Sequence, residues 1–496
     1  MKLRVSVIRS LFCAFVLTAS HNVFAQQTVS APPIADRYRA NATRLIAAAL
    51  ADSVAYNRLA RLTDTFGHRF SGSASLEAAI DWILAEMKRD GLQNVRGEKV
   101  MVPRWVRGNE SAMLVSPRRY RLHMLGLGRS VGTPPAGITV PVLVVGSFDE
   151  FARRQAEAKG KIVLFDAPFV SYGETVRYRG RAASTAARAG AVAALIRSIA
   201  SNSIQNPHTG AMSYDTTVAR IPAAALSVED AMMLHRMSDR GEKIVVTLKM
   251  EAKTLPDAPS RNVIAEIVGS EKPDEVVVIG GHIDSWDVGQ GAMDDGGGSV
   301  AAWEVVRLIK DLGLRPRRTI RVVLWTNEEN GSRGALAYRD THAHELDKHV
   351  LAMESDAGVF KPLGYRVTGP DSAVAIVRDI ASLLAGIGAT SAEAGGPDVD
   401  VGPLAERGVP AASPIVDGTR YFWYHHSDGD TIDKLNPREM SECVAVNGGA
   451  GLHRRGHAWH SRAGGSDARW LAISPRRVRQ ALTSPAPRPF PTGPRS

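Results

Sequence analysis

One stretch of the chain, residues 276–329, constrains the fold more than any other. It consists of an apolar β-branched run (276–279), a Gly-rich polar loop, a helical segment (299–311), a second apolar run (320–325) and a final polar loop. A strand–helix–strand unit of this kind builds a parallel sheet. Its polar loops follow the carboxyl ends of the strands, where open α/β sheets place their ligands. The stretch therefore predicts an α/β fold, with a mostly parallel sheet flanked by helices and a site at one sheet edge.

Side chains that bind metals or transfer protons recur in the loops after the expected strands. The candidates are His282, Asp294, Glu328, Glu329, Asp356 and the pair His425-His426. Imidazole and carboxylate together suit zinc, cobalt or manganese, and five ligands that share one carboxylate would hold two ions. Of two adjacent glutamates, one would bind metal while its neighbour accepts a proton. Asp284, two residues beyond His282, would orient that imidazole.

Each of these signals is weak alone. Asp-Asp-Gly is a common turn, Glu-Glu is a common solvated helix start, and adjacent histidines are often a buried, hydrogen-bonded pair. The conjunction is informative because several strand ends each supply a ligand-type residue at the edge expected to hold a site.

The formal net charge of +10 does not indicate a nucleic-acid or membrane-surface partner, because the charge is confined to the ends of the chain. Residues 1–25 carry +3, and residues 447–496 carry nine Arg and one acid, hence +8. The body, 26–446, has the remaining charge of −1, so the high pI says nothing about its partners.

The N-terminus, 1–25, has the features of a secretory signal peptide: a basic start, an apolar core at 11–18 and a small-residue cleavage site ending at Ala25. The core is too short to span a bilayer. We therefore expect an exported protein, periplasmic or secreted, without a membrane span. After cleavage Cys443 is the sole cysteine, so no internal disulfide can form.

The sequence changes character between 113 and 253, where short apolar runs alternate with Gly, Pro and Ser. We interpret this part as a smaller α/β module inserted into a main domain made of 26–112 and 254–446. Residues 447–496 are rich in Arg, Pro and Gly without helical periodicity, which predicts a disordered tail.

Four segments in a fixed order carry a resemblance to a known family: GGHIDSWDVGQGAMDDGGG (280–298), WTNEENGSRGA (325–335), MESDAG (353–358) and YFWYHHSDGDT (421–431). With them the chain resembles the M28 family of co-catalytic zinc peptidases, in particular its carboxypeptidase Q group. FGHRFSGS (66–73) also matches that group, and the inserted module resembles a protease-associated domain. The resemblance implies a zinc exopeptidase fold with a mixed sheet.

The resemblance implies a role for each candidate residue. The implied ligands of two zinc ions per chain are His282 and Asp356 for one ion, Glu329 and His426 for the other, and Asp294 as the bridge between them. Glu328 would be the general base. His426 is chosen over His425 because the family ligand directly precedes Ser or Thr, and His425 is the fallback. The resemblance also implies a cis peptide bond between Asp294 and Asp295.

The implied activity is hydrolysis of short peptides, foremost dipeptides with free termini, by a metal-activated water. Tyr421 or Tyr424 would donate to the developing oxyanion, although a core role is the commoner one for such an aromatic run. The family also favours a homodimer. A general aminopeptidase is the nearest alternative. A non-catalytic, receptor-like binding protein is less favoured, because all five ligand positions and Glu328 carry competent side chains.

The C-terminus departs from the family. A final amphipathic helix is expected to begin near Pro437 and to continue well beyond Asn447, yet the composition changes there and Arg replaces Lys entirely. A reading-frame change near Asn447 is our hypothesis, and a natural basic tail is the alternative. Sequencing the coding DNA tests it, because an apolar helix in another frame would support the change and its absence would exclude it.

Overall fold

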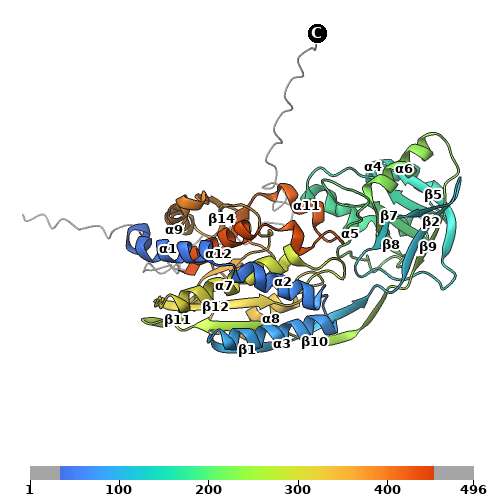
Figure 1. Ribbon diagram of the computed structural model, residues 1–496. Coiled ribbons are helices and arrows are strands. Elements are labelled where there is room, and N and C mark those ends of the chain that lie inside the picture. Colours follow the sequence, from blue (N-terminus) through green and yellow to red (C-terminus); the bar gives the residue numbers. More distant parts are fainter. Residues whose placement is uncertain (1–33, 452–496) are drawn as a thin grey trace, which may run out of the picture.

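The structure, a computed structural model, describes residues 34–451, which form two α/β lobes, each built on an eight-stranded sheet (Figure 1). The expected signal peptide and residues 452–496 lie outside the described part. Among residues 34–451, no helix is both long and apolar enough to cross a membrane.

The main lobe has a mixed sheet with the strand order β1-β10-β12-β11-β13-β16-β14-β15. In that order the strands are Gln93–Val106, Lys253–Ile267, Arg318–Trp325, Lys272–His282, His349–Glu354, Ala411–Val416, Pro362–Thr368 and Ser391–Ala394. The central pairs β12–β11, β11–β13 and β13–β16 are parallel. The α/β class and the mixed sheet predicted from the sequence are confirmed.

Helices cover both faces of this sheet. They are α1 (Ile34–Ala51), α2 (Val54–Phe66), α3 (Ala74–Arg89), α7 (Gly297–Asp311), α8 (Arg333–Thr341), α9 (Asp371–Ala381), α10 (Gly402–Ala405), α11 (Tyr421–Tyr424) and α12 (Pro437–Gly451). Alternate residues of β11 face opposite layers: Val277 and Ile279 pack in the core beneath α1, α2 and α7, whereas Val276 and Val278 pack with α8 and α10. Burial on both faces explains why β11 and β12 are continuous apolar runs.

The second lobe is inserted between β1 and β10, which pair along most of their length. Its sheet has the order β3-β2-β9-β5-β6-β7-β8-β4. The strands in that order are Tyr120–Leu122, Glu110–Ser116, Val245–Met250, Ile138–Val145, Ile162–Phe165, Ala193–Arg197, Ala223–Leu226 and Met124–Gly126, and the helices are α4 (Phe148–Arg154), α5 (Tyr172–Arg188) and α6 (Val228–Asp239). We call residues 107–252 the inserted module. Its first strand begins at Glu110, three residues before the boundary expected from the sequence.

The last described helix, α12, packs against α1 and α7. It continues to Gly451, so residues 447–451 are helical and are not part of a disordered tail. Two glycines in this stretch are closely packed: a Cβ on Gly448 would lie 2.6 Å from Leu45, and one on Gly449 would lie 2.3 Å from the Tyr365 hydroxyl. Tertiary contacts therefore hold a helix that the low helix propensity of glycine disfavours.

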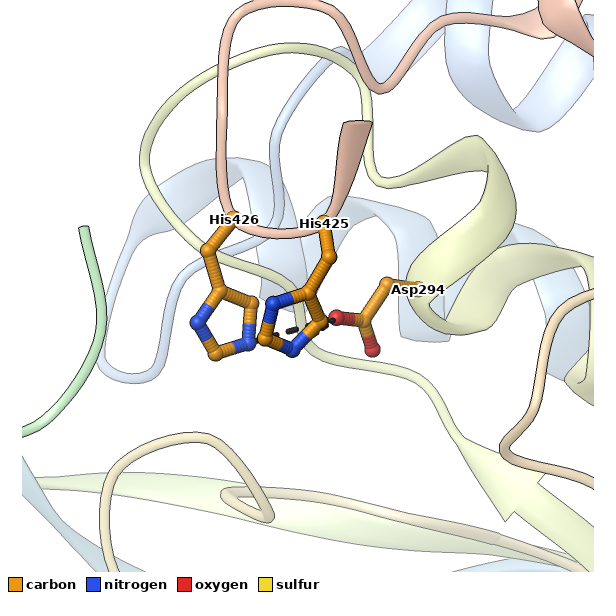
Figure 2. A group of neighbouring side chains, drawn as sticks. All are labelled: Asp294, His425 and His426. Carbon is orange, nitrogen blue, oxygen red and sulfur yellow. Dashed lines mark ion pairs between the residues drawn. The ribbon is translucent and has the colours of Figure 1, made fainter. Parts of the chain in front are cut away.

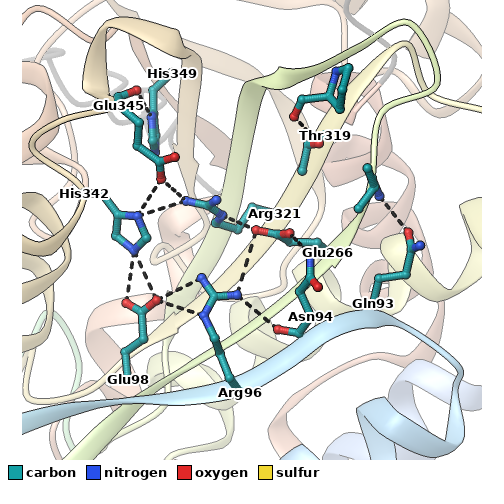
Figure 3. A network of polar contacts seen from close by, with 12 residues as sticks. Gln93, Asn94, Arg96, Glu98, Glu266, Thr319, Arg321, His342, Glu345 and His349 are labelled. Carbon is teal, nitrogen blue, oxygen red and sulfur yellow. Dashed lines mark hydrogen bonds and ion pairs between the residues drawn. The ribbon is translucent and has the colours of Figure 1, made fainter.

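A network of ion pairs joins β1, β10 and β12 to the segment after α8 (Figure 3). Arg321 donates to Glu266 at 2.6 Å and to Glu345 at 2.9 Å, and the His342 ring lies between Glu345 (2.6 Å) and Glu98 (3.1 Å). Burial raises the pKa of Glu345, but the hydrogen bonds and charges of Arg321 and His342 outweigh that effect and lower the pKa to about 2.

Replacing Glu345 by Gln should therefore cost stability in a pH-dependent way. Because the pKa of Glu345 in the folded protein lies below its ordinary value of 4.5, the carboxylate contributes stability that is present above that value and is lost as the pH falls toward 2. At about 1.4 kcal/mol per pKa unit, the stability difference between the wild type and Glu345→Gln should shrink by about 1 kcal/mol from pH 6 to pH 4. Urea unfolding measures it, with Glu393→Gln on the exposed edge of β15 as control. A difference that stays constant would contradict the expectation.

Candidate metal centre

The parallel pairing of β12, β11 and β13 brings the predicted site residues together at one edge of the main sheet. His282 ends β11, Glu328 and Glu329 follow β12, and Asp356 follows β13. Asp294 lies just before α7, and His426 follows α11. All of these residues except His282 line one pocket, and His282 contacts Asp294, which does. The edge inferred from strand order is thus where the candidates meet.

Two sets of ligand-type atoms share Asp294. His282 Nε2 lies 3.2 Å from Asp294 Oδ1 and 3.3 Å from Asp356 Oδ1. His426 Nε2 lies 3.2 Å from Asp294 Oδ2 and 3.0 Å from Glu329 Oε2. The two carboxylate oxygens of Asp294 therefore point to different imidazoles, which is the arrangement that a bridging ligand requires.

These residues fit metal cations. Asp294 Oδ2, Glu329 Oε1 and Asp356 Oδ1 are buried oxygen atoms that accept no hydrogen bond from the described residues. Several buried carboxylates close together are costly unless positive charge compensates them. The nitrogen donors are also prepared: His282 Nδ1 lies 2.9 Å from the Asp284 carbonyl oxygen. A proton on Nδ1, donated to that carbonyl, leaves the Nε2 lone pair free to bind a metal.

Asp284 orients His282 through its backbone rather than through its side chain. The carboxylate oxygen lies 3.7 Å from His282 Nδ1, whereas the carbonyl oxygen lies 2.9 Å away. The carboxylate instead accepts hydrogen bonds from the backbone N–H of Glu328 (3.0 Å) and from the Ser71 hydroxyl (3.2 Å). Asp284 therefore fixes two candidate residues at once.

The two adjacent histidines lie side by side, and both face Asp294 (Figure 2). Their rings stack with centroids 3.5 Å apart. His426 Nε2 contacts both Asp294 and Glu329, but His425 Nε2 lies 3.6 Å from Asp294 Oδ2. Both histidines therefore belong, with Asp294, to one group that could hold a metal ion, and His426 also contacts Glu329.

Opposite electrostatic effects act on neighbouring carboxyls. Burial raises the pKa of Glu328 well above its ordinary value; the charge of His282 opposes this effect and that of Glu329 adds to it. Burial also raises the pKa of Asp294, but the neighbouring imidazoles of His282 and His426 outweigh burial and lower that pKa well below its ordinary value. A nearby metal cation favours ionised carboxylates and would therefore lower the pKa of Glu328.

Two residues that shape the site were not singled out from the sequence. Arg69, fully buried, donates to the carbonyl oxygens of Ile283 (2.9 Å), Gln290 (2.8 Å) and Gly291 (2.8 Å). Asp430 accepts from the backbone N–H groups of Met293 and Asp294, at 2.7 and 3.2 Å. Together they fix the loop that presents Asp294. The sequence signals were that Arg69 lies inside FGHRFSGS and that Asp430 lies inside YFWYHHSDGDT. The Asp294–Asp295 peptide bond is cis, as the resemblance implies.

The cluster opens into a pocket of about 650 Å³ whose walls come from both lobes. The main lobe supplies Val399, Ile415 and Tyr421, and helix α5 of the inserted module supplies Tyr172 and Arg179. A ligand bound against the cluster would therefore contact the module as well.

This fold and site, with a carboxylate–imidazole cluster and an adjacent glutamate at the edge of a mixed sheet, define a metal-dependent hydrolase. Residues 262–449 match peptidase family M28, and residues 135–234 match the PA domain. Carboxypeptidase Q of Homo sapiens is 50% identical over 396 residues, which cover 80% of this chain and 84% of that protein. The chain belongs to peptidase family M28 and is a metallopeptidase with a PA domain inserted in its peptidase domain.

Solved structures agree with this assignment. The crystal structure of a peptidase M28 precursor from Shewanella amazonensis SB2B matches with a TM-score of 0.80 at 36% identity, over 84% of this chain and 96% of that one. BSAP, a zinc aminopeptidase from Bacillus subtilis, matches with a TM-score of 0.61 at 22% identity, over 80% and 93% of the two chains. The latter likeness shows the fold alone.

Proposed function

We propose that the protein is an exported dinuclear zinc exopeptidase that hydrolyses short peptides, foremost dipeptides. The observation that carries the proposal is the division of the cluster into two ligand sets that share Asp294. His282 and Asp356 would hold one zinc ion, and Glu329 and His426 the other. Mixed nitrogen and oxygen donors suit zinc, and the related fold of BSAP belongs to a zinc enzyme.

Zinc bound there would polarise the scissile carbonyl and lower the pKa of a water molecule. Glu328 accepts the proton that the water loses on attack and returns it to the leaving amine. Its backbone is held by Asp284, and its side chain borders the pocket without belonging to either ligand set. Of the two tyrosines that could donate a hydrogen bond to the oxyanion, Tyr421 lines this pocket. Tyr424 is not among the described residues that line it.

Arg179 supports a carboxypeptidase or dipeptidase over an aminopeptidase. This nearly buried guanidinium borders the pocket. It donates to the Tyr172 hydroxyl (2.6 Å) and the Thr209 carbonyl (3.3 Å), and its Nη1 lies 3.4 Å from His426 Nδ1. Its Nε has no acceptor among the described residues, and no acidic side chain within residues 34–451 forms an ion pair with it. The α-carboxylate of a short peptide is an anion that such a guanidinium binds well.

The proposal predicts that hydrolysis requires zinc and is faster for a free C-terminus than for the matching amide. Purified enzyme should cleave unblocked dipeptides, lose activity on chelation and regain it with zinc. Arg179→Met should lower kcat/KM for a dipeptide about 10- to 100-fold, the worth of a charge-assisted hydrogen bond, and should change cleavage of the matching C-terminal amide little. Arg179→Lys keeps the charge and should lose less.

Two outcomes would replace this proposal. Equal cleavage of the free acid and the amide by the wild type would indicate a general aminopeptidase. Absence of hydrolysis by folded, zinc-loaded protein would indicate the receptor-like alternative.

Export and assembly belong to the same proposal. The signal peptide predicted at 1–25 lies outside the described residues, and N-terminal sequencing of the protein from the periplasm and the medium would test its cleavage. A homodimer, which the family favours, is tested by light scattering.

A further inference from the structure

The loop that carries His426 is held from outside the main lobe. We call residues 421–430 the histidine loop. The inserted module contacts it through residues 198–210, which we call the module loop. Thr209 N–H donates to the carbonyl oxygen of His426 itself at 2.8 Å. Asn206 Nδ2 donates to Ser427 Oγ at 2.7 Å. A third bond joins the N–H of Ser201 to the carbonyl of Phe422 at 3.3 Å.

The histidine loop needs such support because its conformation is unfavourable. His426 has φ of 58°, in the left-handed region that residues other than glycine rarely adopt. The main lobe packs against Tyr421 and Tyr424 near the start of the loop. At the far end, the Asp430 carbonyl accepts from Gln290 N–H at 2.7 Å. Among residues 34–451, it is the module that donates a hydrogen bond to the backbone of His426 from outside the histidine loop.

A second contact fixes the module beside the other ligand set. Trp286, four residues after His282, packs its ring directly against Gly128 of the module. The contact is so close that a Cβ on Gly128 would lie 2.0 Å from the ring. Arg107 pairs with Asp287 through both carboxylate oxygens, at 2.5 and 2.8 Å. These side chains are largely buried. The module is therefore docked closely against both metal-binding loops.

We propose that the inserted module is a structural part of the metal centre: the module loop holds His426 in its metal-binding position, so docking of the module and zinc binding at the Glu329–His426 position favour each other. Linkage requires reciprocity: if docking raises the affinity for zinc, zinc must stabilise docking by the same factor. Thr209 and Asn206 are thus positioning residues that act through His426. The inference rests on the proposed role of His426 as a ligand.

The first test is hydrogen exchange of the full-length wild type, zinc-depleted and with excess Zn²⁺. Zinc should slow exchange in both the histidine loop and the module loop. Strand β5, at the far edge of the module in Figure 1, should not change. Protection restricted to the histidine loop would overturn the inference.

The second test is competitive titration of the zinc-depleted protein with a chromophoric zinc chelator. Asn206→Ala removes one hydrogen bond and should weaken one of the two zinc affinities about two- to tenfold. Thr139→Ala, which breaks a side-chain hydrogen bond to Thr247 on the far strands, is the matched control and should bind like the wild type. Equal affinities in both variants would overturn the inference.

A third variant separates the two proposals. His426→Asn should abolish one zinc site. If it does while Asn206→Ala binds normally, the proposed ligand set stands and only the role of the module loop is overturned. If His426→Asn also binds two zinc ions normally, the ligand assignment fails and the inference fails with it.

Discussion

Glu328→Gln should lower kcat/KM about 10²- to 10⁴-fold, the usual contribution of a general base, while both zinc ions stay bound. The side-chain amide of Gln has nearly the shape of the Glu328 carboxylate but cannot accept the proton of the attacking water. Binding of the dipeptide should change little, because Glu328 belongs to neither ligand set. The backbone hydrogen bond from Glu328 to Asp284 is unaffected, so we expect the fold to be retained. Steady-state kinetics and metal analysis of the same preparation measure both effects.

Glu329→Gln is the matched control, because it makes the same chemical change one residue away. Glu329 Oε2 lies 3.0 Å from His426 Nε2, so this variant should lose zinc as well as activity. If Glu328→Gln lost an ion and Glu329→Gln kept both, the two glutamates would have exchanged roles.

The adjacent histidines should respond very differently to the same substitution. His426→Asn is expected to bind one zinc ion instead of two and to lose activity about 10³-fold, because a metal ion is worth several kcal/mol to the transition state and about 1.4 kcal/mol corresponds to tenfold in rate. Asn is the appropriate replacement, since it tolerates the positive φ of His426. Metal analysis and kinetics provide the readout.

His425→Asn makes the same change on the neighbouring ring. His425, Asp294 and His426 could together hold a metal ion. His425 nevertheless lies 3.6 Å from Asp294 and forms no ion pair with Glu329 among the described residues, so this variant should retain both ions. Loss of an ion from His425→Asn alone would identify the fallback residue as the ligand.

The main sheet could be predicted from residues 276–329 because strand and helix periodicities are local properties of a sequence. The place of the site followed from the same stretch, since parallel strands end at one edge. What escaped prediction depends on contacts distant in sequence. Arg69 binds carbonyl groups more than 200 residues away, and no local pattern distinguishes such an arginine from a surface one.

The same limit explains the C-terminal boundary. Composition indicates a break at Asn447, and glycines follow it. The helix nevertheless reaches Gly451 because α1 and the main sheet pack against those glycines. The contacts between the module loop and the histidine loop are likewise tertiary, so the sequence identified the module without showing that it reaches the metal centre.

The pairing of β1 with β10 has a consequence for the order in which the protein folds. The inserted module is one continuous stretch between these strands, so its own sheet can form as soon as that stretch is available. The main sheet cannot be completed so early, because β10, the partner of β1, is synthesised only after the entire module. Domains fold as units as the chain emerges, and distant pairings are slow. The module should therefore fold first, and the peptidase domain should assemble around it.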